Sequence, residues 1–298
     1  MKKKLIRKII IYLSFVLPAI IALVLFRFVP VFEGIRLSFL KASMIDNSRS
    51  FNGFVNYINV FKNNYFWRVS LNTISFTIVA LILSGIIGFA AAFVLNTKMR
   101  GRGILRAINI VPWVAPPVVM SIIWTWIYSK YSPINDILLR SGLIKQPFDF
   151  LGNISIGAGP LTLPMISVII VYAWIAYPFI MIMTLSGLQS IPIELYEASQ
   201  IDGASTSQQL KYITFPLLKP LTIITYTLLF IWTFQYFNMN YLMTRGGPRG
   251  YTDVLSTHIY ISAFSKFDFG YAAAAGVMMT LMLIIPSIYY INNVLKSK

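Results

Sequence analysis

The chain contains no cysteine and only one histidine among its 298 residues. Without cysteine, disulfide bonds and thiolate metal sites are excluded, and cysteine usage says nothing about the redox compartment. The pattern H-E-x-x-H is also absent, so no motif indicates a metal site. The sequence therefore predicts neither a metal centre nor a catalytic residue.

Charged residues are scarce. They make up 11% of the chain against 57% hydrophobic residues, and the mean hydropathy is +0.71. A soluble domain carries roughly a quarter charged residues, so this composition indicates an integral membrane protein. The net charge of +16 does not indicate a nucleic-acid partner, because the basic residues gather at the ends of apolar runs rather than in one patch.

Apolar runs long enough to cross a bilayer of ~30 Å as helices recur along the chain. We expect six spans: Ile9–Val29, Val69–Leu95, Ala107–Tyr128, Leu161–Leu188, Leu221–Met243 and Tyr271–Ile291. The predicted fold class is therefore all-α, a polytopic membrane protein with six transmembrane helices in a single domain over residues 1–298. The first run is longer than the ~7 to 15 apolar residues of a signal peptide, so we expect it to be retained.

Two of the expected spans have distinctive features. Gly85 and Gly88 place small residues on the second span, where they allow close packing between membrane helices. Pro112, Pro116 and Pro117 must kink or break the third span, because proline cannot continue the helical hydrogen-bond ladder. The connection Pro30–Trp67 is expected to be an external loop with a short amphipathic segment near Tyr57–Phe66.

Basic residues suggest the orientation of the chain in the membrane. Lys98, Arg100, Arg102 and Arg106 crowd one short loop, Lys2 to Lys8 precede the first span, and Lys296 and Lys298 follow the last. Dense basic residues in short segments favour the cytoplasmic side. Both termini and the loops at 96–106 and 189–219 are therefore expected to be cytoplasmic. His258 then falls in an external segment, where we expect a solvated or interfacial role.

The last five expected spans contain no Asp, Glu, Lys, Arg or His. Ion-coupled transporters normally need an ionisable group inside the membrane, so coupling to a proton gradient is disfavoured. A charged solute would also lack a compensating charge, and a neutral saccharide fits better. Candidate substrate-pathway residues are Tyr177, Trp232, Gln235, Tyr236, Asn238 and Asn240. Interfacial belts and contacts between helices explain such residues about as well.

The phosphate-binding pattern G-x-x-x-x-G-K-[ST] is absent from the chain. Nucleotide hydrolysis, if it drives the protein, must then reside on another polypeptide. We therefore predict that the chain is not an enzyme and binds no cofactor itself.

The polar stretch Ser190–Pro220 lies between two long apolar runs. A first short helix is expected to end at Gly203, since glycine readily adopts the left-handed conformation that terminates helices. Ser205 and Gln208 have the spacing of a capping box for a second helix, which we expect to close at Phe215 before Pro216.

The same stretch resembles a known family. The matching run begins with Glu197, Ala198 and Ser199, reaches Gly203 after three further residues, and ends with Ile213 to Pro216 after nine more. This spacing is similar to the E-A-A(x3)G(x9)I-x-L-P loop of membrane subunits of bacterial ABC importers. Ser199 replaces the second Ala, and Phe215 replaces Leu. The strings at Leu242–Pro248 and Phe267–Ala274 resemble segments of the sugar-permease branch of that family.

This resemblance implies an ABC importer type I permease fold with a core at 69–291 and a cytoplasmic docking loop at 189–219. It implies that an ATPase subunit docks on Glu194, Glu197, Ala198, Ser199, Asp202, Gly203 and Ala204, with Glu197 meeting a basic residue of the ATPase. The implied partners are a second permease subunit, two ATPase subunits that hold ATP and Mg, and an extracellular solute-binding protein. The implied location is the bacterial cytoplasmic membrane.

The expected function is thus ATP-driven import of a neutral carbohydrate. The sequence leaves three alternatives open: an ion-coupled secondary transporter or channel, an ABC permease for another neutral solute, and a membrane scaffold with no pathway of its own.

Overall fold

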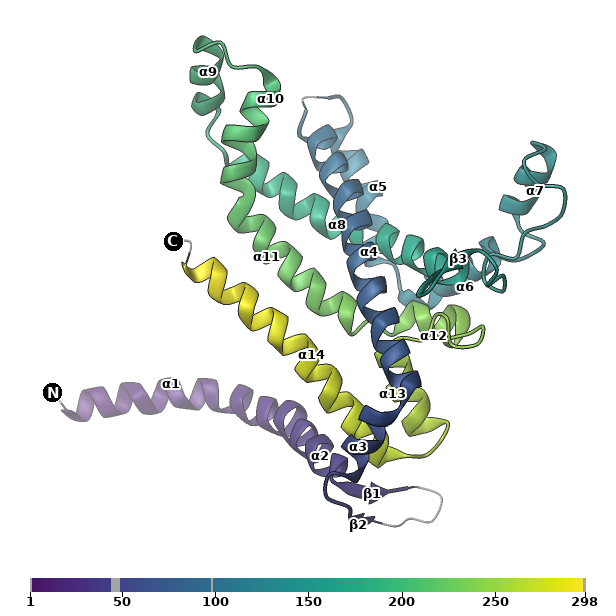
Figure 1. The fold of residues 1–298 in the computed structure, drawn as a ribbon. Coiled ribbons are helices and arrows are strands. Elements are labelled where there is room, and N and C mark those ends of the chain that lie inside the picture. Colours follow the sequence, from purple (N-terminus) through teal and green to yellow (C-terminus); the bar gives the residue numbers. More distant parts are fainter. Residues whose placement is uncertain (1, 44–48, 98, 297–298) are drawn as a thin grey trace. The chain divides into compact units, whose positions relative to one another are not determined.

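The computed structural model describes residues 2–43, 49–97 and 99–296 and shows a mostly helical chain with two short β-hairpins (Figure 1). Lys98 and Lys298, which contributed to the predicted orientation, lie outside the described residues. The chain forms two compact units, Met1–Asn64 with Ile259–Leu281, and Tyr65–His258 with Met282–Lys298. The prediction of one domain over 1–298 stays a prediction.

The first unit begins with one continuous helical run. Helix α1 (Lys2–Leu23) passes through a π-helical turn, η1 (Val24–Phe28), into α2 (Val29–Ser38). The predicted end of this span at Val29 is wrong. Pro30 stands in the first turn of α2, where its missing N–H and fixed φ are tolerated, so the helix continues to Ser38. The part Ser14–Ser38 is long and apolar enough to cross a membrane.

A hairpin and a short helix complete the start of this unit. Strands β1 (Leu40–Ala42) and β2 (Arg49–Phe51) pair antiparallel, and α3 (Val55–Lys62) follows. The Asn56 side chain donates to the carbonyl oxygens of Ser38 and Leu40, at 2.9 and 2.8 Å, and so ties α3 to the end of α2. The amphipathic segment predicted near Tyr57–Phe66 overlaps α3, which ends earlier, at Lys62, whereas no sequence pattern indicated the hairpin.

The remaining helices of the chain's end are α13 (Leu255–Phe264) and α14 (Phe269–Lys296). The start of α14 lies in the first unit, where the Asn63 side chain donates to the Tyr271 hydroxyl at 2.8 Å. The predicted sixth span falls inside α14.

The core of the second unit lies around α8 (Leu163–Ser190), and α4 (Asn64–Asn96) is one of the helices that pack against it. A Cβ at Gly88 would lie 2.7 Å from the Ile180 Cβ and 2.9 Å from the Tyr177 carbonyl oxygen. The two backbones approach this closely only because residue 88 has no side chain. The predicted second and fourth spans are confirmed as these two helices.

The third predicted span is broken. Helix α5 (Arg102–Val114) and α6 (Pro117–Ile127) meet at an angle of 94° across Ala115 and Pro116, both in extended conformation. The predicted interruption of the span Ala107–Tyr128 by proline is confirmed. The described residues contain five helices able to cross a membrane, or six spans if the bent pair counts as one.

Between α6 and α8 the chain forms α7 (Pro133–Arg140) and a small hairpin of β3 (Gly157–Ala158) with β4 (Leu161–Thr162). The Asn135 side chain donates to the Ser129 and Phe148 carbonyl oxygens at 3.0 and 2.9 Å, and thereby closes this excursion at its base.

After α8 the chain folds into a short elbow. It consists of α9 (Ile193–Ile201), α10 (Thr206–Gln209) and a π-helical turn, η2 (Leu210–Thr214), which continues into α11 (Phe215–Phe234). The predicted stop at Gly203, with φ of 78°, and the capping box of Ser205 with Gln208 are confirmed. The predicted helix end at Phe215 is wrong, because Pro216 falls in the first turn of α11, where proline needs no N–H partner. A last short helix, α12 (Asn238–Thr244), follows.

Candidate coupling and substrate sites

Helix α9 presents the predicted docking residues on an exposed elbow, folded back beside α10 at the start of α11 (Figure 1). None of its residues is buried within the chain. Glu194, Glu197 and Asp202 are exposed, and the side chain of Ile201 is 88% exposed. An apolar side chain so fully in solvent, beside carboxylates on a small helix, has the composition of a contact for another protein.

A closed set of hydrogen bonds, here called the elbow ring, joins α9 to η2. The Gln209 amide donates to the Ser199 hydroxyl at 2.8 Å and to the Tyr196 carbonyl oxygen at 3.3 Å. The Thr214 hydroxyl donates to the Gln209 carbonyl oxygen and lies 2.9 Å from the Tyr196 hydroxyl. Because Thr214 has only one hydroxyl proton, the Tyr196 hydroxyl is the donor between the two.

Three aromatic rings from three helices meet where α5 ends. Trp113 stacks on Phe179 of α8 with 5.2 Å between ring centroids, and Trp232 of α11 contacts both rings, at 5.8 Å and 5.0 Å. Trp113 and Trp232 remain 37% and 39% exposed. We call these three residues the aromatic triad.

The triad lies at two interruptions of apolar helices. Trp113 stands just before the break between α5 and α6, and Trp232 stands near the end of α11, before the non-helical residues ahead of α12. Interrupted helices at membrane depth are tolerated only where they are buried in protein or line a water-filled cavity. The partial exposure of both indoles is consistent with the second case.

The predicted substrate-pathway residues do not form one cluster. Tyr177 is buried and donates its hydroxyl to the Asn109 side chain of α5 at 2.9 Å. Tyr236 packs edge-on against the ring of Tyr172, with 4.5 Å between centroids. Asn240 is fully buried, and its amide donates to the Thr252 carbonyl oxygen at 3.2 Å.

Of the other predicted pathway residues, Trp232 belongs to the aromatic triad. Gln235 is exposed directly after α11, and Asn238 begins α12, half-buried. Their roles as substrate contacts stay predictions.

His258 occupies a different environment from the one expected. Its side chain is buried, and Nδ1 lies 3.6 Å from a carboxylate oxygen of Asp253, which is buried as well. The same carboxylate accepts hydrogen bonds from the Tyr65 hydroxyl, at 2.7 Å, and from the Thr257 hydroxyl. The expected solvated or interfacial role is therefore wrong, because this histidine is packed around a buried acid that needs partners.

The Asp253 cluster also holds the loop after α12 against the start of α4. The Asn72 side chain donates to the carbonyl oxygens of Gly250 and Asp253, at 3.1 and 2.9 Å. Arg68 donates to the Arg249 carbonyl oxygen and lies over the Tyr65 ring. The loop is thus fixed by side chains of α4.

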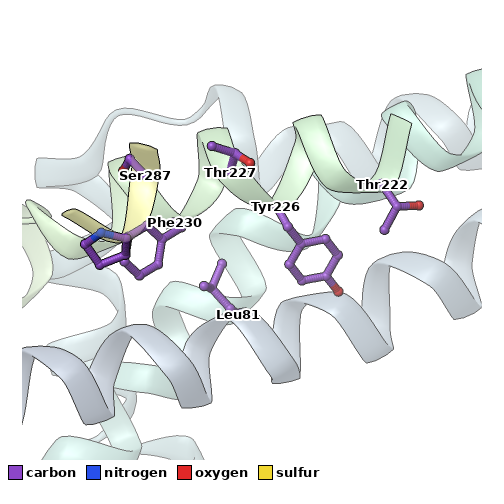
Figure 2. A pocket seen from close by; sticks show the side chains of 7 residues that line it. Leu81, Thr222, Tyr226, Thr227, Phe230 and Ser287 are labelled. Atoms are coloured by element: carbon purple, nitrogen blue, oxygen red, sulfur yellow. The ribbon is translucent and has the colours of Figure 1, made fainter. Parts of the chain in front are cut away.

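An apolar hollow of about 440 Å³ lies between α4, α11 and the end of α14, within the second unit (Figure 2). Its lining residues are Leu81, Thr222, Tyr226, Thr227, Phe230, Pro286 and Ser287. Figure 2 shows Tyr226 reaching from α11 toward α4, where its hydroxyl lies over Gly85. No lining residue is charged, and the hollow has the character of a surface that faces lipid or another helix.

Comparison with known protein families gives a match over residues 84–293 to the family described as the inner membrane component of binding-protein-dependent transport systems. The chain belongs to this family. It is a multi-pass membrane protein and a translocation component, and is called the permease from here on.

Relatives of known name support this assignment over nearly the whole permease. It is 32% identical over 281 residues to the trehalose/maltose transport system permease protein MalF of Thermococcus litoralis, with 93% of this chain and 91% of the relative covered. It is 30% identical over 292 residues to the diacetylchitobiose uptake system permease protein DasB of Streptomyces coelicolor, with 95% and 86% covered.

The fold of the permease also matches a solved structure. The crystal structure of a bacterial ABC transporter involved in the import of the acidic polysaccharide alginate contains a chain that matches with a TM-score of 0.85 and 22% identity, covering 99% of this chain and 98% of that one. This match supports the type I importer permease fold that the sequence predicted.

Sequence reasoning missed several residues of the permease that the structure brings together. Trp113 was visible beside Pro112, but nothing in the sequence placed it against Phe179 and Trp232. Gln209 carried no signal, because its partner Ser199 lies ten residues away on another helix. These residues can be found only once the breaks and the elbow are placed.

Proposed function

We propose that the permease is the membrane-spanning subunit of an ATP-driven importer that moves a neutral carbohydrate across the bacterial cytoplasmic membrane. The observation that carries the proposal is the aromatic triad, which is partly exposed at helix breaks beside α8, a helix without charged residues.

The chemistry of the triad suits a sugar. An aromatic face carries partial negative charge, which attracts the polarised C–H groups on one side of a sugar ring. Trp113 and Trp232 offer such faces, and Gln235 supplies an exposed amide for hydroxyl groups nearby in the chain. Binding sites of this kind combine apolar walls with a few polar groups that set orientation.

The proposal of a neutral substrate rests on the scarcity of charged residues in α8 and α11. Helix α8 contains no Asp, Glu, Lys, Arg or His, and in α11 the only such residue is Lys219, in the second turn. A charged solute at the level of the triad would meet no counter-charge in a setting where unpaired charge is costly. The names of the two relatives, one for trehalose and maltose and one for diacetylchitobiose, also support a saccharide.

The energy source is proposed to be an ATPase on a separate chain, since the sequence has no phosphate-binding loop. The proposed docking surface is α9 with the three residues that follow it. Its predicted contacts are Glu194, Glu197, Ala198, Ser199, Asp202, Gly203 and Ala204, and the exposed Ile201 is proposed as a further contact. ATP and Mg would be held by the ATPase. Both termini and the elbow are proposed to face the cytoplasm.

The assembly is proposed to contain a second permease subunit, two ATPase subunits and an extracellular solute-binding protein. In the mechanism that this suggests, closure of the ATPases on ATP displaces α9. The displacement passes into α11 and changes which side of the membrane the aromatic triad faces. The transported sugar is released when the triad faces the cytoplasm.

Uptake by proteoliposomes that contain the complete assembly tests the proposal. We expect ATP-dependent accumulation of labelled di- or oligosaccharides, and we expect Trp232→Leu and Trp113→Leu each to raise the half-saturating sugar concentration about tenfold, as the loss of one stacking contact would. Trp126→Leu is the matched control, because Trp126 is an exposed tryptophan of α6 outside the triad. Equal effects of all three substitutions would argue against a sugar site at the triad.

A further inference from the structure

The elbow ring stands out because α9 has little else to hold it. No side chain of α9 is buried in the chain, so packing does not fix its orientation. Two short connections join α9 to the permease, at Ile191–Pro192 and at Asp202–Ser205. The hydrogen bonds from Gln209 and Thr214 are therefore the specific attachments of α9 to the structure that follows it.

The elbow-ring residues outside α9 are held firmly by the rest of the chain. Thr214 and Gln209 are both buried, so water competes poorly for their hydrogen bonds. Both residues adjoin η2, which passes into α11 with helical backbone conformation at each end. A π-helical turn of this kind often marks a functional position in a helix. The ring thus connects α9 to the helix that carries Trp232.

Ser199 gives this connection a feature that the general loop pattern lacks. The pattern has alanine at this position, and alanine cannot accept a hydrogen bond from its side chain. In this permease the Ser199 hydroxyl accepts from Gln209 at 2.8 Å and donates to the Tyr196 carbonyl oxygen at 2.8 Å. Gln209 is thereby held by two acceptors on α9.

We propose that Gln209, acting through Ser199 and Tyr196, is a positioning residue that makes α9 and α11 move as one body during transport. The inference rests on the proposed function, in which α9 receives the displacement from the ATPase. Without the Gln209 side chain, α9 would turn on its two connections, and its displacement would reach Trp232 only in part.

A distance measurement tests the mechanical part of the proposal. Because the chain has no cysteine, Ile193→Cys and Ile224→Cys place two spin labels at exposed sites, one on α9 and one on α11, without background. In the complete assembly we expect one narrow distance distribution that is the same with and without ATP. Adding Gln209→Met, which keeps the side-chain length but removes the amide, is expected to broaden it. An unchanged distribution in that variant would overturn the proposal.

A transport measurement tests the functional part. In proteoliposomes, Gln209→Met is expected to lower the sugar transported per ATP hydrolysed about fivefold, the effect of one buried hydrogen bond, while the ATPase still copurifies. Gln146→Met is the control, because Gln146 is exposed in the loop after α7, outside both the ring and α9. An unchanged ratio, or a loss explained fully by loss of the ATPase, would refute a coupling role.

A double-mutant cycle distinguishes a loss of the contact between Gln209 and Ser199 from a general loss of stability. Ser199→Ala alone is expected to lower the ratio less than Gln209→Met, because the Tyr196 carbonyl oxygen remains as an acceptor. Added to Gln209→Met, it should change nothing further, since both act through one contact. Additive losses would contradict the proposal. If the unmodified assembly showed no ATP-dependent uptake, the proposed function would fail, and the spin-label distances would still decide whether the ring joins α9 to α11.

Discussion

At the scale of single residues, the permease contains apolar side chains in solvent that a protein partner would cover. Ile201 is the clearest, because it lies on a short polar helix with its side chain in solvent. A docked ATPase would remove this apolar surface from water, which favours association.

Ile201→Asp is expected to lower the amount of ATPase that copurifies with the permease at least tenfold, because a carboxylate would be buried without a partner on docking. The fold should not suffer, since the side chain touches little of its own chain. Ile137→Asp on α7 is the control, at another exposed isoleucine. If both variants retained the ATPase equally, Ile201 would not be part of the docking surface.

Gly88 is a residue whose lack of a side chain is required by packing. We expect Gly88→Val to destabilise the permease by about 1 to 3 kcal/mol, because the added carbons overlap Ile180 and the Tyr177 carbonyl oxygen. Gly276→Val on α14 is the comparison, since no atom lies within 4 Å of a Cβ built there. Thermal unfolding in detergent measures both, and a drop in melting temperature that is equal for both would point to helix propensity instead.

At the scale of elements, the sequence predicted helices well and their ends poorly. Long apolar runs fixed α4 and α8, and Pro116 with Pro117 predicted the break before α6. Pro216 misled, because it was taken to end a helix and instead lies in a first helical turn that follows a π-helical turn, and Pro30, just after the expected end of the first span, lies in the same kind of position. Proline alone does not distinguish a helix end from such a continuation.

The candidate sites, too, were predicted only in part. The elbow was predicted because its signals are local, namely Gly203 and the capping box at Ser205. The aromatic triad was not, because Trp113, Phe179 and Trp232 are separated by more than fifty residues at each step. The burial of His258 was missed since Asp253, its partner in space, looks like a loop residue in sequence.

Gly203 sets the direction in which the elbow turns. With φ of 78°, it adopts a conformation that valine strongly disfavours, so Gly203→Val is expected to shift α9 relative to α10 and to weaken ATPase association and uptake together. Gly142→Val is the control, because Gly142 has φ of 74° at the end of α7 and equally open surroundings. Normal assembly and normal transport in Gly203→Val would count against docking through the elbow.

The Asp253 cluster is expected to hold the loop after α12 in place. Asp253→Asn removes the charge on which the hydrogen bonds from Tyr65 and Thr257 depend, at a cost of about 1 to 3 kcal/mol. Amide hydrogen exchange across residues 245–258 should become about five- to 100-fold faster, because each 1.4 kcal/mol is a factor of ten. Asp136→Asn, in an exposed ion pair on α7, is the control and should leave that exchange unchanged. Unchanged exchange in Asp253→Asn would show that the loop is held by other contacts.

At the scale of the whole permease, the distribution of charge separates two classes of transporter. Arg68 and Lys219 are each the fifth residue of a long helix, and α8 and Phe269–Ile288 contain no Asp, Glu, Lys, Arg or His. A protein driven by an ion gradient needs a group within the membrane that binds the ion or senses the field. The apolar parts of these four helices offer no such group, which favours a driving force that enters from outside them, as proposed for the elbow.

The absence of charged residues from the apolar parts of these helices predicts how transport responds to its energy sources. In proteoliposomes that contain the complete assembly, uphill accumulation of sugar is expected to continue when ionophores collapse the proton and sodium gradients, because no span couples to them. Accumulation should cease when ATP is replaced by a non-hydrolysable analogue, and also when the ATPase is omitted. Labelled sugar inside the vesicles measures each case. Sugar accumulated against its gradient without the ATPase would place the permease among secondary transporters, and α9 would then need another explanation.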